Sequence, residues 1–194
     1  MDFLDETVSV LAEIVSQSDL LIDRPERMEA VNVFFLRHGE AGRRVAIPSK
    51  DMERSLTETG KEEIEKIARS LENMDLEFDK IATSPLARAH ETAEIVARIQ
   101  KKSGKVELWD ELRPEGNRLD LFRRLSRMRQ DANVLLVGHE PQLSNAIGEI
   151  ISGNLASRIV IKKGGLARIE ITSFSPKPSG ELRWLLTPRQ LKKM

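Results

Sequence analysis

The sequence predicts an α/β fold, a three-layer sandwich in which helices cover both faces of a mostly parallel, mixed β-sheet. Short apolar runs, typical of buried strands, alternate with longer segments whose apolar residues recur at helical spacing. Polar side chains that can bind or react with a ligand directly follow three of these runs. In a parallel sheet, the carboxyl ends of the strands are where ligands bind. The length of 194 residues suits one domain with one hydrophobic core.

Composition limits the possible functions. The 31 basic and 31 acidic residues give a formal net charge of zero, whereas general nucleic-acid or membrane-surface binders usually carry a basic excess. The chain has no cysteine, which excludes disulfides, a thiol nucleophile and cysteine metal ligands. The chain has three histidines, so it offers few candidate ligands for a zinc site built from histidines and carboxylates. We expect neither a metal nor another cofactor, and neither a nucleic-acid nor a membrane partner.

Targeting signals are missing from the sequence. No apolar run approaches the roughly 20 residues of a membrane helix. Acidic residues occupy the N-terminal positions that are basic in a signal peptide, and the first basic residue is Arg24. We therefore expect a cytoplasmic protein.

The chain divides into an N-terminal helical extension, residues 1–30, and a main domain, residues 31–194. Leu4, Val8, Leu11 and Val15 share one helical face. This face either packs on the domain or dimerises, although two heptads are short for a stable coiled coil. The oligomeric state stays open.

Within the main domain, helices and strands alternate up to a terminal antiparallel part. Ser84 is expected as an N-cap, with Pro85 at the first helical position. The expected helices are at 58–73 (capped by Thr57), from 84 to about 101, at 118–129 and from 141 through 151. The expected strands are from 31 to the Arg37-His38-Gly39 turn, and at 78–83, 106–109, 133–137, 158–161, 166–172 and 181–187, with a polar loop at 41–56.

The ends of three strands bring cations and histidines together. In a parallel sheet Arg37-His38, the 84–88 segment and Gly138-His139 lie at the same edge. Guanidinium groups bind phosphate oxygens bidentately, and the helix N-terminus near Pro85 adds backbone donors. Nearby cations lower the pKa of a histidine, which is then neutral and able to attack phosphorus. The pattern predicts a pocket for a multiply charged anion.

Three motifs resemble the signatures of the histidine phosphatase superfamily, which also contains the cofactor-dependent phosphoglycerate mutases. They are Arg37-His38-Gly39, the Ser84-Pro85-Leu86-Ala87-Arg88-Ala89-His90-Glu91-Thr92-Ala93 run, and Gly138-His139. The resemblance extends from about residue 31 to the C-terminus and implies a phosphoglycerate mutase-like fold. It implies that His38 is transiently phosphorylated, that Arg37 and Arg88 bind the phosphoryl group, and that His139 completes the pocket.

The connection between Thr92 and Gly138 is too short for the large helical insertion that covers the site in the mutases and in many sugar phosphatases of this superfamily. The Glu111–Pro114 loop and the Leu186–Lys192 segment resemble the SixA-type phosphohistidine phosphatases. An open site can admit phosphohistidine on a signalling or phosphotransfer protein. Two alternatives stay open: a phosphatase for small phosphate esters, and a phosphoprotein-binding module without turnover.

The remaining candidates concern the leaving group and the surroundings of the pocket. An alkoxide needs a general acid, whereas an imidazole leaves readily once its other nitrogen is protonated. Glu111 is the first candidate for the acid, followed by Asp110 and Glu115. Ser84 can add a secondary phosphate contact. Alternative roles are a surface ion pair of Arg88 with Glu91 or Glu94, and a structural or solvated role for His90.

Overall fold

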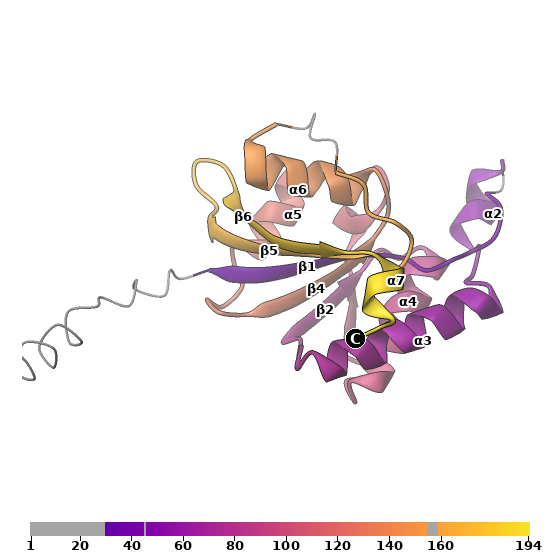
Figure 1. Cartoon of the computed structure of the whole chain (residues 1–194). Coiled ribbons are helices and arrows are strands. Elements are labelled where there is room, and N and C mark those ends of the chain that lie inside the picture. The colour runs from indigo at the N-terminus through magenta and orange to yellow at the C-terminus, as the bar shows by residue number, and fades with distance from the viewer. Residues whose placement is uncertain (1–29, 45, 155–158) are drawn as a thin grey trace, which may run out of the picture.

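The computed structural model describes residues 30–44, 46–154 and 159–194 (Figure 1). The predicted N-terminal helical extension, apart from residue 30, and the first residue of the predicted strand at 158–161 lie outside the described residues. Within the described part, six strands form one sheet in the order β3-β2-β4-β1-β5-β6. They are β1 (Val31–Arg37), β2 (Lys80–Thr83), β3 (Val106–Leu108), β4 (Asn133–Gly138), β5 (Leu166–Ser173) and β6 (Ser179–Leu186).

The sheet is mixed, as predicted. β1 pairs in parallel with β4, which pairs in parallel with β2, and β2 pairs in parallel with β3. β5 and β6 extend the sheet in antiparallel fashion. Arg37 is the register partner of Gly138, and Thr83 is the partner of Val137. The carboxyl ends of β1, β2 and β4 therefore lie side by side, and the residues that follow them share one edge of the sheet.

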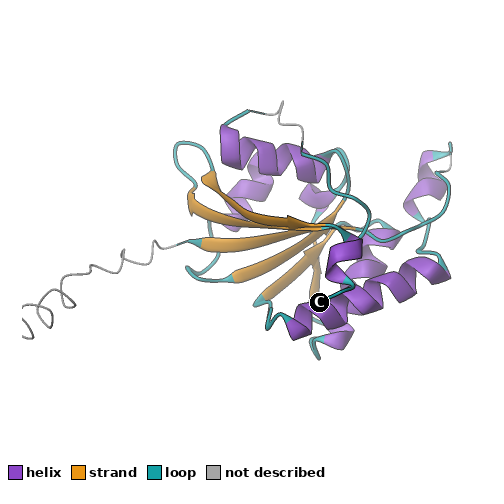
Figure 2. Ribbon diagram, in the orientation of Figure 1, coloured by secondary structure: helices purple, strands orange, loops and turns teal. Residues whose placement is uncertain are grey.

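Helices cover both faces of this sheet (Figure 2). α3 (Glu58–Asn73), α4 (Ala87–Ile99) and the short α7 (Pro188–Leu191) pack on one face, where Ile64, Ala89 and Leu191 join one buried cluster. α5 (Arg118–Leu125) and α6 (Gln142–Ser152) cover the other face. None of the helices in the described part has the length and hydropathy that a membrane crossing needs.

The polar loop predicted at 41–56 contains a short helix, α2 (Pro48–Met52), and a 3-10 turn, η1 (Asp110–Leu112), follows β3. Tertiary contacts explain why the pattern missed α2. The backbone carbonyl of Asp51 accepts a hydrogen bond from Arg88 at 2.8 Å, and its carboxylate binds Arg54 at 2.9 Å. A five-residue helix is too short to form from propensity alone.

Two other expectations were wrong. α4 begins at Ala87, with Leu86 rather than Ser84 at its N-cap, because the Ser84 N–H pairs with the Val137 carbonyl and extends the β2–β4 pairing. Residues 159–161 form no strand. The Ile161 N–H instead donates to the Glu140 carboxylate, and its carbonyl accepts from Arg37. In both places a contact between segments distant in sequence replaces the local pattern.

Some boundaries also moved. β2 begins at Lys80, two residues later than predicted, and β3 ends at Leu108, one residue earlier. α4 ends at Ile99, and α5 ends at Leu125 rather than near residue 129.

Candidate active site

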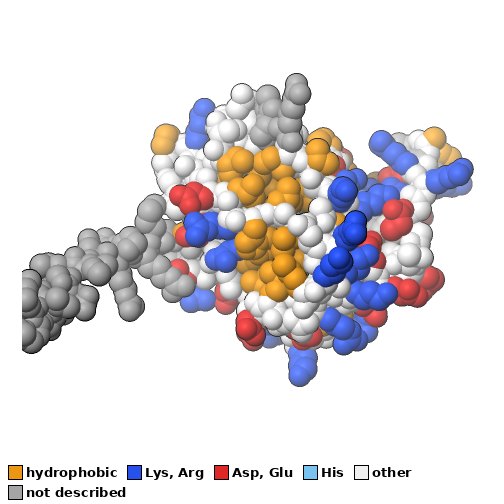
Figure 3. Space-filling model, viewed as in Figure 1, with side chains coloured by type: hydrophobic (Ala, Val, Ile, Leu, Met, Phe, Trp, Pro, Cys, Tyr) orange, Lys and Arg blue, Asp and Glu red, His pale blue; other side chains and the backbone are white. Residues whose placement is uncertain are grey.

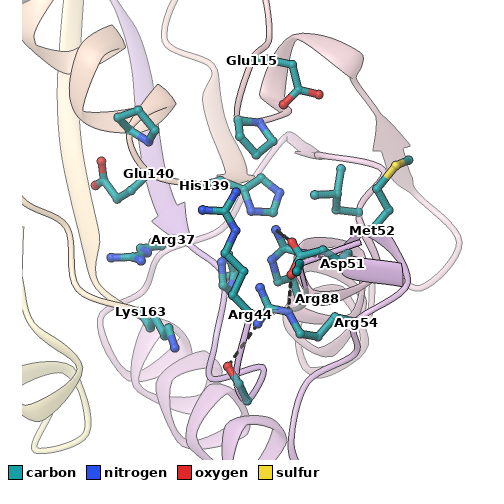
Figure 4. Close-up of a pocket in the computed structure, with 16 residues that line it drawn as sticks. Arg37, Arg44, Asp51, Met52, Arg54, Arg88, Glu115, His139, Glu140 and Lys163 are labelled. Carbon is teal, nitrogen blue, oxygen red and sulfur yellow. Dashed lines mark hydrogen bonds and ion pairs between the residues drawn. The ribbon is translucent and has the colours of Figure 1, made fainter. Parts of the chain in front are cut away.

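A cleft of about 910 Å³ lies at the carboxyl edge of the sheet (Figure 4). β1 and β4 deliver His38 and His139, whose ring centroids lie 4.9 Å apart, and α4 delivers Arg88. The predicted convergence of Arg37, His38, Arg88 and His139 is therefore present. The full lining comprises Arg37, His38, Gly42, Arg44, Ala46, Asp51, Met52, Arg54, Leu86, Arg88, Pro114, Glu115, His139, Glu140, Pro141 and Lys163.

His38 is oriented by its neighbour. The side chain is only 5% exposed, and its Nδ1 lies 2.7 Å from the Gly39 carbonyl oxygen. Because a carbonyl only accepts hydrogen bonds, we assign the ring proton to Nδ1, which leaves the lone pair on Nε2. The pKa of His38 is lowered to about 4, chiefly by burial and to a smaller extent by the charges of Arg88 and Arg37, against the opposing effect of the Gly39 hydrogen bond. His38 is consequently a neutral imidazole at pH 7.

Thr92 connects this histidine to the helix that bears Arg88. The Gly39 N–H donates to the Thr92 hydroxyl oxygen at 3.1 Å, and the same hydroxyl donates to the Arg88 carbonyl at 2.7 Å. Thr92 is fully buried. The peptide that orients His38 is thereby held against α4. The sequence placed Thr92 inside a motif but assigned it no role, because nothing local indicates that its hydroxyl reaches β1.

The two arginines are held by backbone carbonyls. Arg88 Nη1 donates to the Asp51 carbonyl at 2.8 Å, and Arg37 Nη1 donates to the Ile161 carbonyl at 2.8 Å. Burial, followed by the positive charge of Arg54, lowers the pKa of Arg88, whereas Asp51 opposes this shift. Each guanidinium is thus fixed at one end, as a preorganised anion site requires.

The alternative surface ion pairs for Arg88 are not formed. The Glu91 carboxylate accepts from the Leu56 N–H at 2.9 Å, and Glu94 lies 3.4 Å from His90. His90 is partly exposed and does not line the cleft. Arg88, by contrast, is 5% exposed.

Unsatisfied buried nitrogens concentrate in this cleft. Four of the seven buried side-chain nitrogen and oxygen atoms that lack a hydrogen-bond partner in the described part belong to its lining: Nε of Arg37, Nε of Arg88 and both ring nitrogens of His139. Burial, together with smaller contributions from nearby positive charge, lowers the pKa of His139 to about 2. Buried polar groups normally have partners. This concentration therefore marks a place where a ligand supplies the acceptors.

Further cations surround the cleft (Figure 4). Arg54 Nε binds the Asp51 carboxylate at 2.9 Å, and its Nη1 donates to the Ala41 carbonyl at 2.8 Å. Lys163 binds Glu40 at 2.7 Å, and this hydrogen bond lowers the pKa of the Glu40 carboxyl. Among the described residues no group of three or more histidines and carboxylates is placed to hold a metal ion. The donor set suits an anion. Sequence reasoning missed Arg54, because its segment resembled an ordinary polar loop.

Ser84 does not line the cleft. It is fully buried, and its hydroxyl oxygen accepts from the Leu86 N–H at 3.3 Å. The side chain thus stabilises the turn before α4. The phosphate contact expected for Ser84 is absent from this arrangement.

Glu111 is also displaced from its expected position. Its carboxylate binds Arg124 at 3.1 Å and faces a separate hollow. Glu115, four residues later, lines the cleft instead. The buried Gln142 holds the intervening loop, since its Nε2 donates to the carbonyls of Glu111 at 3.0 Å and Gly116 at 2.7 Å. The structure therefore favours Glu115 over Glu111 as a carboxylate that faces the cleft.

Comparisons with known proteins agree with this arrangement. Residues 33–114 match the family model of the histidine phosphatase superfamily (branch 1). An uncharacterized protein of Picosynechococcus is 32% identical over 165 residues, which cover 83% of this chain and 99% of that protein. The phosphohistidine phosphatase SixA of Escherichia coli K12 is 26% identical over 164 residues, which cover 84% of this chain and 97% of SixA.

Solved structures show the same fold. A protein histidine phosphatase SixA complexed with tungstate has a TM-score of 0.71 and 26% identity, over 82% of this chain and 99% of that one. A phosphoglycerate mutase from Bacillus anthracis has a TM-score of 0.58 at 16% identity, over 86% and 98% of the two chains, and supports the fold alone. The predicted phosphoglycerate mutase-like fold is confirmed.

An anion cleft built from buried arginines and neutral histidines at the edge of an α/β sheet is the site of an enzyme that handles phosphoryl groups. The chain belongs to the histidine phosphatase superfamily and is a phosphatase that is similar to SixA in sequence and structure.

Proposed function

We propose that this phosphatase removes the phosphoryl group from phosphohistidine on a signalling or phosphotransfer protein, with His38 as the covalent nucleophile. The observation that carries the proposal is the state of His38. The Gly39 carbonyl holds its Nδ1–H, and its lowered pKa keeps the ring neutral. The Nε2 lone pair is thus available beside Arg88 and His139.

In the first step Nε2 of His38 attacks phosphorus, and the P–N bond of the substrate breaks. Arg37 and Arg88 bind the phosphoryl oxygens through the Nε–H groups that lack partners in the described part, and His139 binds them through the ring nitrogen that carries its one proton. The substrate imidazole, protonated on its other nitrogen, leaves as a neutral ring. His38 keeps its Nδ1–H, and the Gly39 carbonyl stabilises the positive charge on the phosphorylated imidazole.

In the second step water attacks phosphorus, and the bond to His38 Nε2 breaks. The water loses a proton as inorganic phosphate forms, and Glu115 is the proposed acceptor. This carboxylate lines the cleft, is exposed, and forms no hydrogen bond or ion pair within the described part. It replaces Glu111, the acid first expected from the sequence, because Glu111 is engaged by Arg124.

Two features support a protein-borne substrate. The connection from α4 to β4 contains β3, η1 and α5 and has no further helical insertion, so the cleft remains accessible from outside. Transfer from one imidazole to another also requires less acid assistance than expulsion of an alkoxide. The resemblance to SixA, which is named a phosphohistidine phosphatase, adds support at 26% identity.

Rapid-quench assays with a ³²P-labelled phosphohistidine protein and with phosphate monoesters test the proposal. We expect a phosphoenzyme that is labile in acid and stable in base, hydrolysis of the phosphohistidine protein, and loss of both in His38→Ala. His90→Ala is the matched control, because His90 lies outside the cleft.

Each alternative has its own outcome. Hydrolysis of the esters alone would favour the small-ester phosphatase. Intact turnover in His38→Ala would remove the nucleophile assignment. Absence of a phosphoenzyme and of turnover with both substrate classes would favour the binding module.

We also propose that residues 1–30 form an extension to a catalytic domain at residues 31–194. Size-exclusion measurements with and without residues 1–28 test whether the extension sets the oligomeric state. Retained phosphatase activity in the shortened chain is the expected result.

A further inference from the structure

The segment around α2 forms one wall of the cleft and also faces outward. Arg44 and Met52 line the cleft, whereas Ile47 is 50% exposed and Met52 is 43% exposed. Figure 1 shows α2 standing away from the sandwich, beyond the end of α3. Figure 3 shows basic side chains gathered on this part of the surface, with hydrophobic atoms at its outer end. We call Arg43, Arg44, Ile47, Lys50 and Met52 the rim surface.

The rim surface is not explained by contacts within the domain. Arg43, Arg44 and Lys50 are exposed and form no hydrogen bond or ion pair with the described residues. Elsewhere basic side chains often have a carboxylate partner, as Lys80 and Arg98 do. Exposed apolar side chains beside unpaired charges are typical of a surface that binds a partner.

The inner side of the same segment is fixed to the catalytic groups. The Asp51 carbonyl accepts from Arg88 Nη1 at 2.8 Å, and its carboxylate binds Arg54 at 2.9 Å. Arg54 also binds the carbonyls of Ala41 and Gly42. A molecule that binds the outer side is therefore held at a defined place relative to Arg88.

The charge of this segment suits an acidic partner. The chain as a whole has a formal net charge of zero. Between residues 43 and 54 there are four cations and two carboxylates, Asp51 and Glu53, and Asp51 is already bound to Arg54 and Arg88. The exposed Glu53 is thus the one carboxylate of this segment that opposes the three cations of the rim surface.

We propose that the rim surface docks the phosphoprotein substrate, and that it recognises an apolar side chain and acidic residues beside the phosphohistidine. This inference rests on the proposed function. The cleft binds the phosphoryl group, and the rim surface binds the protein that carries it. A small phosphate ester placed between Arg37 and Arg88 has no group that reaches the outward-facing Ile47.

Two phosphohistidine peptides and free phosphohistidine test the proposal. One peptide has Asp, Glu and Leu beside the phosphohistidine, and the other has Lys and Ser there. We expect kcat/KM to be about tenfold higher for the acidic–apolar peptide in the wild-type protein. Ile47→Ser and Lys50→Glu should each lower this preference several-fold and leave turnover of free phosphohistidine unchanged, because neither residue lines the cleft.

The matched controls are Leu119→Ser and Lys177→Glu. Leu119 is 59% exposed on α5, and Lys177 is exposed in the loop before β6, so each repeats the chemical change outside the rim surface. Both controls should keep the wild-type preference. Circular dichroism melts check that all four variants are folded.

Binding of the same two peptides with a non-hydrolysable phosphohistidine analogue separates docking from catalysis. Equal affinity for both peptides would overturn the docking proposal, whatever the turnover. If Ile47→Ser and Lys50→Glu lowered kcat/KM equally for the peptides and for free phosphohistidine, the proposal would also be overturned. The substitutions would then affect the catalytic groups of the cleft and not the docking of the peptide. Preferential binding without hydrolysis of any phosphohistidine substrate would retain the docking surface and overturn the proposed function.

Discussion

Two charged hollows of the described structure differ in how their charges are satisfied. In the cleft, Arg37, Arg88 and His139 retain buried nitrogens without partners. In the second hollow, lined by Glu111, Asp120, Arg123, Arg124 and Arg127, four of the five charged side chains bind one another. Arg123 pairs with Asp120 at 2.7 Å, Arg124 pairs with Glu111 at 3.1 Å, and the Arg124 guanidinium lies 4.7 Å from the centre of the Trp109 ring.

A concentration of charged side chains therefore does not by itself define a binding site. Exposed ion pairs such as Arg123–Asp120 contribute about 0–1 kcal/mol and have little left to offer a ligand. A buried donor or acceptor without a partner costs about 1–3 kcal/mol. One such atom occurs in the second hollow, on Glu111, whereas four occur in the cleft. Several buried polar atoms without partners at one place indicate a site where a bound ligand forms the missing hydrogen bonds.

Arg88→Ala should produce the largest contrast between the two hollows. Loss of a preorganised donor to a phosphoryl transition state lowers kcat by about 10²–10³-fold. Arg124→Ala, which removes a cation from the second hollow, should leave kcat close to the wild-type value. Steady-state kinetics on phosphohistidine measures both. Similar losses in the two variants would mean that the distinction between the hollows is not functional.

Thr92→Val tests how far the cleft depends on its supports. The variant removes the hydroxyl that joins Gly39 to Arg88. We expect His38 and Arg88 to shift slightly, and a small displacement of a reacting group lowers turnover roughly 10- to 100-fold. Thr92→Ser retains the hydroxyl and should restore most of kcat. The affinity for inorganic phosphate should fall by a smaller factor than kcat does, because Arg37 still provides its donor. Failure of serine to rescue would assign the effect to packing.

Glu115→Gln and Glu111→Gln sharpen the comparison between the two carboxylates. Loss of Glu115 should lower turnover of a phosphate monoester by about tenfold or more, since an alkoxide needs an acid. The effect on phosphohistidine should be smaller, because imidazole leaves more readily. Glu111→Gln should leave both activities near wild type. A larger effect from Glu111→Gln would restore the first expectation from the sequence.

The two histidines of the cleft should also make the stability of the protein depend on pH. Burial and neighbouring positive charge lower the pKa of His38 to about 4 and that of His139 to about 2, from the ordinary value of 6.5. Below pH 6.5 the unfolded chain therefore binds more protons than the folded one. The corresponding part of the unfolding free energy is fully present above pH 6.5 and is lost as the pH falls toward 4.

NMR titration of the histidine ring signals, assigned by substitution, measures these pKa values directly. Urea unfolding at pH 7 and near pH 4 measures the accompanying loss of stability. Inorganic phosphate should raise the pKa of His38, because a dianion favours the imidazolium. A His38 midpoint at its ordinary value would contradict the buried, neutral nucleophile.

Much of the fold followed from local patterns. Apolar periodicity predicted α3 from residue 58 to about residue 73, with Thr57 as its N-cap, and the observed helix is Glu58–Asn73. The order of strands and helices predicted that His38 and His139 share one edge of the sheet. The register of β1 with β4 agrees with that expectation, because parallel strands must present their carboxyl ends together.

The sequence by itself thus determined the α/β layers and the meeting of Arg37, His38, Arg88 and His139, since periodicity and strand order are local and topological properties. Only the tertiary structure decided the surroundings of the site. Thr92 reaches Gly39, Asp51 reaches Arg88, and Arg124 withdraws Glu111 from the cleft. These contacts join segments 13 to 53 residues apart, and their side-chain directions depend on the packing of whole elements.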